Sequence, residues 1–214
     1  MCFSPSVDFI AGAAIAVVAV DAARHCHSMR QAPLAALPAI FAFHTLISGL
    51  VWLGFDGIAP STISSPATMI YLSIAFVLLP IYVPIAVLLI EPRGWRRWAL
   101  TGLTLAGLYA GIDYTLRLAS GRGYATENAN YIDFNITGTS SLSAVLYVVA
   151  TCGAFLLSGY PRLVTWGVLN VIVVGLLVLF ISRGLPSLWC FWAAATSFFI
   201  AWFLRDQEHQ GLSA

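Results

Sequence analysis

Long apolar runs, separated by short polar connections, occupy most of the chain. Seven of these runs approach or exceed the roughly 20 residues that a helix needs to cross a bilayer. They cover about residues 5–25, 32–54, 67–91, 98–118, 140–158, 161–182 and 186–205. The pattern therefore predicts an all-α membrane protein, a bundle of seven transmembrane helices that forms a single domain.

Prolines support this division of the chain. Proline at the first turn of a helix loses nothing, because the missing N–H would have no partner there. Four of the runs have a proline near their start: Pro5, Pro66, Pro161 and Pro186. The third run also contains Pro80 and Pro84 in its interior, where proline predicts a kink.

The composition agrees with a membrane environment. Of the 214 residues, 60% are apolar and 9% are charged, whereas a soluble domain has about 25% charged residues. Membrane lipid is thus the expected partner of much of the surface. All ten cationic residues are arginines, and the lack of lysine excludes a retinal Schiff base and pyridoxal phosphate as cofactors. The net charge of +1 gives no case for nucleic acid.

The distribution of arginines predicts the orientation. Threading the seven runs through a bilayer places most arginines on one side: Arg24, Arg30, Arg93, Arg96, Arg97, Arg162 and Arg205. The other side receives Arg117, Arg122 and Arg183. By the positive-inside rule the N-terminus is outside and the C-terminus is cytoplasmic. We therefore expect a multi-pass protein of the plasma (inner) membrane.

One connection is longer than the others, the predicted outer loop at about residues 119–139. Apolar and polar residues alternate over Tyr131–Ile136, which is typical of a strand. We expect this run to form a short strand or hairpin that folds over the mouth of the bundle.

Polar side chains within the apolar runs are functional candidates, because burying them in a bilayer is costly. His44, Ser48 and Trp52 follow one another at one-turn spacing on the second helix. His44 either packs against neighbouring helices through a hydrogen bond, or it binds a metal, carries a proton or binds a polar group of a ligand. The other histidines, His25, His27 and His209, fall on the cytoplasmic side. We therefore expect neither bis-histidine haem ligation nor a structural zinc site at His44.

The second half of the chain adds further candidates for a ligand site. Asp113 and Arg117 have the i,i+4 spacing of an ion pair; alternatively, Asp113 faces a cavity as a proton acceptor or ligand anchor. Three more polar or aromatic side chains could line a cavity that opens outward with His44: Tyr109, Tyr147 and Asn170. Trp189, which we expect near the outer membrane interface, is a further candidate for this ligand site.

Cys2 and Cys190 form the other pair of interest, for a disulfide or a metal site. Both precede or begin helices at their predicted outer ends. A disulfide, a shared metal and simple packing of two thiols are all open.

Three segments resemble a known family. They are Met1-Cys2-Phe3-Ser4, the Pro80–Pro84 segment running into Glu91-Pro92 and Arg96-Arg97, and the Ser187–Ala194 segment with Trp189-Cys190-Phe191. Together they are similar to a bacterial membrane-protein family of unknown activity whose members begin Met-Cys-Phe-Ser. The resemblance spans nearly the whole chain and implies seven helices. The family usually has glutamine at the position of His44 and an acidic residue near Ser48, so this chain departs from it there.

Three functions fit these features. The first, which we favour, is binding of a small hydrophobic ligand (a lipid, quinone or pigment) in an outward-opening cavity. The second is a membrane enzyme, with or without a metal, that uses Cys2, Cys190, His44 or Asp113. The third is an accessory subunit that docks onto other membrane subunits.

Overall fold

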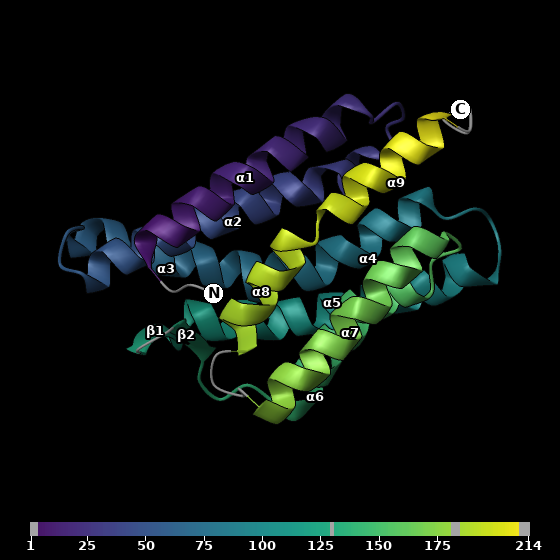
Figure 1. Cartoon of the computed structure of the whole chain (residues 1–214). Helices are drawn as coiled ribbons and strands as arrows, with labels where there is room; N and C mark the ends of the chain where they lie inside the picture. Colours follow the sequence, from purple (N-terminus) through teal and green to yellow (C-terminus); the bar gives the residue numbers. More distant parts are fainter. Residues whose placement is uncertain (1–3, 129–130, 181–184, 210–214) are drawn as a thin grey trace.

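Figure 1 shows a computed structural model, which describes residues 4–128, 131–180 and 185–209. Helices stand at all seven predicted places. The α-helices are α1 Pro5–Arg24, α2 Ala32–Phe55, α3 Ser61–Leu72, α4 Leu79–Ile90, α5 Trp95–Ala119, α6 Ser141–Leu156, α7 Pro161–Phe180, α8 Leu185–Ala195 and α9 Phe198–His209. A π-helical segment, η1 Ser73–Leu78, joins α3 to α4, so these three form one continuous rod.

Several of these helices meet the requirements of a membrane span. Five stretches are long and apolar enough to cross a bilayer: Pro5–Arg24, Ala32–Phe55, Ser61–Ile90, Pro161–Phe180 and Ser187–Glu208. α6 is apolar but shorter, and α5 is long but carries more polar side chains. The chain is therefore a multi-span membrane protein.

The helix start predicted at Pro5 is confirmed. α1 begins at Pro5, and the hydroxyl of Ser4 accepts a hydrogen bond from the amide of Val7, 3.4 Å away. This is the N-cap arrangement that satisfies a free amide in the first turn. α1 then packs along α2, as the purple and blue ribbons of Figure 1 show.

The third span adjusts to its prolines with a π-helical segment. η1 ends two residues before Pro80. Proline cannot donate to the carbonyl four residues earlier, so Pro80 and Pro84 interrupt the hydrogen-bond ladder of the α-helix. A π-helical turn is a common way to absorb such an interruption, and it stands where the sequence predicted a kink.

The seventh predicted span differs from expectation. One continuous helix was predicted over residues 186–205, but the structure has a turn at Thr196 and Ser197 between α8 and α9. Both side chains bond backbone carbonyls of the preceding turn: Thr196 Oγ1 donates to Trp192 and Ser197 Oγ to Ala194. Such side-chain bonds compete with the helical ladder, although the same bond at Thr45 and Thr151 leaves α2 and α6 continuous. At the break, Thr196 in addition accepts the indole N–H of Trp166 from α7.

The strand predicted within the long connection is present. β1 Gly123–Asn128 and β2 Tyr131–Ile136 pair antiparallel, with Gly123 opposite Ile136. The alternation predicted here sends Ile132, Phe134 and Ile136 into the core. β2 packs against α8, so the hairpin covers one end of the bundle (Figure 1).

Candidate ligand-binding cavity

A cavity lies in the core between α2, α4, α6, α7 and α8. Its volume is about 40 Å3. The lining is apolar and aromatic except for a few polar groups. It comprises Phe41, Leu79, Val83, Tyr147, Thr151, Cys152, Phe155, Trp166, Asn170, Trp189, Cys190 and Ala193.

Tyr147 of α6 supplies the polar group that no other side chain uses. Its ring meets the indole of Trp189 edge to face, with centroids 5.3 Å apart. Its hydroxyl has no hydrogen-bond partner among the residues that the structure describes. A buried phenol hydroxyl usually finds a partner, so this one is available to a molecule in the cavity.

Asn170 of α7 is held by two tryptophans. Its amide nitrogen donates to the carbonyl of Trp166, and its oxygen accepts the Trp189 indole N–H at 3.4 Å. The indole of Trp166 in turn donates to Thr196 Oγ1 at 2.7 Å, at the break between α8 and α9. Asn170 therefore fixes the aromatic wall of the cavity and connects it to the interrupted helix.

Cysteines face the cavity from two helices. Cys152 of α6 and Cys190 of α8 are both buried and line it. Sequence reasoning did not single out Cys152, because α6 is apolar on all sides and its inward face cannot be identified from periodicity. Cys2 lies outside the described residues, so its pairing with Cys190 stays a prediction.

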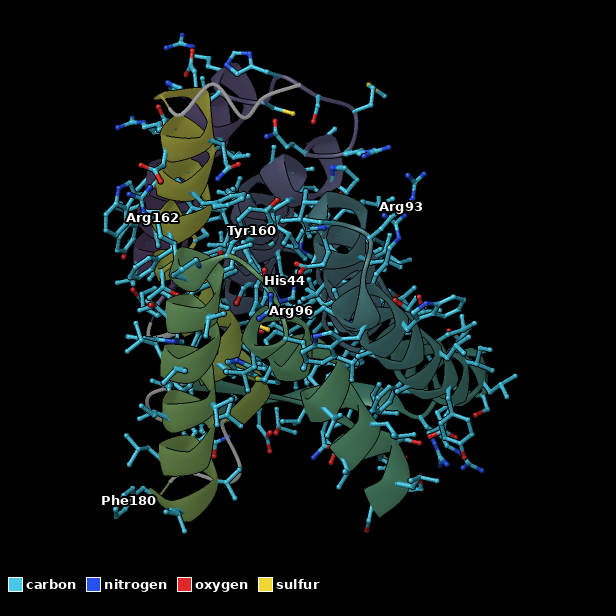
Figure 2. All side chains as sticks on the ribbon, turned by 90° about the vertical axis from the view of Figure 1, so that its right-hand side faces the viewer. His44, Arg93, Arg96, Tyr160, Arg162 and Phe180 are labelled. Carbon is cyan, nitrogen blue, oxygen red and sulfur yellow. The ribbon has the colours of Figure 1, made fainter. Side chains whose placement is uncertain are left out.

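His44 is buried near the centre of the bundle, as Figure 2 shows, but it does not line the cavity. Ser48 and Trp52 are buried with it, so the face predicted from their spacing is an inward face. The His44 ring stacks on Tyr71 at 3.9 Å, and Tyr71 stacks on Phe134 of β2 at 3.5 Å. Neither His44 nitrogen has a hydrogen-bond partner within the described part of the chain.

The ion pair predicted between Asp113 and Arg117 is present. Two guanidinium nitrogens contact the two carboxylate oxygens at 2.9 and 3.0 Å. Asp113 also accepts the hydroxyl of Ser143 at 2.7 Å, and Arg117 bonds the carbonyl of Gly138. This cluster joins α5, α6 and the end of the hairpin, and Asp113 is not part of the cavity lining.

The structure thus brings some of the predicted residues together and separates others. Tyr147, Asn170, Trp189 and Cys190 share one cavity. Tyr109 is 51% exposed on the outside of α5. His44 lies in the stack with Tyr71 and Phe134, and Ser48 is buried one turn further along α2. No group of three or more metal-binding side chains occurs in residues 4–128, 131–180 and 185–209.

A family model matches residues 1–213, and its description reads "Family of unknown function (DUF6629)". The chain belongs to this family. No curated protein and no solved structure matches the chain. The match agrees with the expectation of a family of unknown activity that spans nearly the whole chain, and any activity of this DUF6629 protein must be inferred from its own residues.

Proposed function

We propose that this DUF6629 protein binds a small hydrophobic ligand that carries a hydrogen-bonding group, in the core cavity between α2, α4, α6, α7 and α8. The observation that carries the proposal is the free hydroxyl of Tyr147 in an otherwise apolar and aromatic lining. Ligand sites characteristically combine apolar walls with a few polar groups that fix orientation. A quinone, a pigment or a lipid with a carbonyl or hydroxyl fits this chemistry.

The break between α8 and α9 supports a binding role. Non-helical backbone at membrane depth is tolerated where protein buries it or where it lines a cavity. Membrane proteins place ligand sites at such broken helices. Here Thr196 at the break holds Trp166, and Trp166 forms part of the cavity wall.

The small volume of the cavity limits how a ligand enters. About 40 Å3 has room for a small group such as a methyl or hydroxyl but not for a whole ring, because an engineered cavity that binds benzene measures about 150 Å3. A ring therefore enters by displacing a wall side chain. Trp189 of α8 is the wall residue closest to Tyr147 by ring contact, and we propose that it moves.

Filling the cavity is expected to abolish ligand retention. The variant Ala193→Phe places a ring in the lining, and native mass spectrometry of the gently purified protein should then show at least tenfold less bound ligand. Ala195→Phe is the matched control, because Ala195 is exposed on the same helix. Tyr147→Phe removes one hydrogen bond of about 1 kcal/mol and should weaken binding roughly fivefold. Equal ligand content in wild type and Ala193→Phe would refute the proposal.

We also propose that the N-terminus is outside and the C-terminus cytoplasmic, on the basis of the arginine distribution. Alkaline phosphatase is active only outside the cytoplasm, so a fusion after Ala214 should give low activity. A fusion in the connection between α5 and α6 should give high activity. High activity of the C-terminal fusion would contradict this orientation.

A further inference from the structure

A second concave site lies at the end of the bundle where α4 meets α5. This end is on the right in Figure 1 and faces the viewer in Figure 2, where Arg93, Arg96 and Tyr160 are labelled. The cleft has a volume of about 430 Å3. It is lined by Ser28, Arg30, Gln31, Ile90, Glu91, Pro92, Arg93, Arg97, Tyr160, Phe203 and Gln207.

Three arginines line the cleft without an acidic partner. Arg30 follows α1, Arg93 lies between α4 and α5, and Arg97 is in the first turn of α5. Within the described residues, ion pairs of arginine are formed only by Arg117, Arg162 and Arg205. Among the described residues, the guanidinium groups of Arg30 and Arg93 have no hydrogen-bond partner. That of Arg97 donates once, to the carbonyl of Glu91, and keeps its other donors for an anion.

Three acidic side chains at this end contact basic residues outside the cleft. Asp21 contacts Arg205, Asp206 contacts Arg162, and Glu208 contacts His25 and His27. None of these three acids lines the cleft. The local excess of positive charge is thus a property of the fold and not only of the composition.

Glu91 is the one acid in the lining, and it is committed to the backbone. It is only 4% exposed, and both its oxygens accept the amide of Gly159, at 2.9 and 3.1 Å. Its own carbonyl accepts a bond from Arg97 Nη1 at 3.3 Å. Glu91 therefore connects the floor of the cleft to the segment between α6 and α7. The cleft lining contains three guanidinium groups and one carboxylate, so its net charge is positive.

Neutral donors complete the site. The amide of Gln207 is at least nine-tenths buried in the lining, and among the described residues it has no hydrogen-bond partner. The hydroxyl of Tyr160 already donates to the carbonyl of Ile90 at 3.2 Å, so it holds the end of α4 at the cleft and does not serve as a donor to the anion. The N-terminus of the 25-residue helix α5 has no side-chain cap, and its dipole favours an anion beside Arg93 and Arg97.

We propose that this cleft is a binding site for a phosphate group, carried by the headgroup of an anionic lipid or by free inorganic phosphate. Guanidinium groups bind phosphate through paired, charge-assisted hydrogen bonds, and three of them from separate elements can surround its oxygens. Gln207 adds an uncharged donor to the same anion. Ile90 and Phe203 give the cleft an apolar wall, against which the glycerol and acyl part of a lipid would pack.

The test compares charge removal inside and outside the cleft, using the full-length protein in nanodiscs of phosphatidylcholine with and without phosphatidate. Each arginine near anionic lipid contributes about a fivefold change in affinity, so Arg93→Gln with Arg97→Gln should weaken phosphatidate binding about thirtyfold. Arg24→Gln is the matched control, because Arg24 is exposed at the same end and does not line the cleft. Like the cleft arginines, it has no acidic partner in the part of the chain that the structure describes. A third variant, Arg30→Gln, probes the cleft from a different element if the double variant fails to fold.

Two arms distinguish the sources of phosphate. In the first, native mass spectrometry measures phosphatidate retained by each variant. In the second, inorganic phosphate is added to protein in phosphatidylcholine alone, and the shift in thermal midpoint is measured. A cleft-dependent effect in either arm supports the site and identifies its ligand. Equal responses of wild type and Arg93→Gln/Arg97→Gln, or an equal loss in Arg24→Gln, would overturn it.

Discussion

Gly107→Ala is expected to destabilise the protein by about 3 kcal/mol, the upper range for overpacking of a well-packed interior. The structure leaves no room for a side chain at this position. A Cβ atom there would overlap the carbonyl oxygen of Pro80 and lie 3.3 Å from the Cβ of Ala150. The contact is with backbone, so no rotamer change relieves it, and α4 and α5 must separate.

The clash has its origin in the prolines of the third span. In an α-helix the carbonyl of Pro80 would accept the amide of residue 84, but Pro84 has no N–H. The oxygen of Pro80 is instead directed at the backbone of α5 beside Gly107. Such close approach of two helices is typical of interfaces between small residues in membranes.

Gly102→Ala provides the matched control for this prediction. Gly102 is on the same helix, and a Cβ there would meet nothing within 4 Å. Alanine should leave the thermal midpoint unchanged or slightly higher, because glycine is a poor helix former. Thermal unfolding in detergent measures both variants. A Gly107→Ala protein as stable as Gly102→Ala would show that α4 and α5 do not pack through this glycine.

Much of the fold could be predicted because the signals are local. The apolar runs located the seven helical stretches, although the third begins at Ser61 and contains Pro66, which was predicted to start it. The alternation over Tyr131–Ile136 located a strand and its buried face. The spacing of Asp113 and Arg117 predicted their ion pair, since i,i+4 neighbours meet on any helix. Each of these inferences needs only the geometry of a single element.

The cavity and the cationic cleft could not be predicted, because both depend on how helices face one another. Apolar residues surround α6 and α7 on all sides, so periodicity did not distinguish Tyr147, which lines the cavity, from Tyr109 of α5, which is exposed. The break at Thr196 was missed for a related reason. At the break, Thr196 bonds a nearby backbone carbonyl and the indole of Trp166 on another helix. Neither hydrogen bond can be predicted from the hydropathy of the sequence.

Phe134→Ala is expected to lower the free energy of unfolding by about 3–5 kcal/mol, the usual cost of removing a buried phenylalanine side chain. Phe134 is fully buried and stacks on Tyr71, which stacks on His44. Its removal should therefore release the hairpin as well as reduce stability. Asn135→Ala is the control, because Asn135 is exposed on the same strand.

The stack makes this prediction specific to the hairpin. Ile132 and Ile136 flank Phe134 on the buried face of β2, but Phe134 is the residue whose ring reaches the second and third spans through Tyr71 and His44. Added protease should cleave residues 123–136 of Phe134→Ala at least tenfold faster than those of wild type, while Asn135→Ala should match wild type. Equal cleavage rates in all three proteins would mean that the two isoleucines alone hold the hairpin on the bundle.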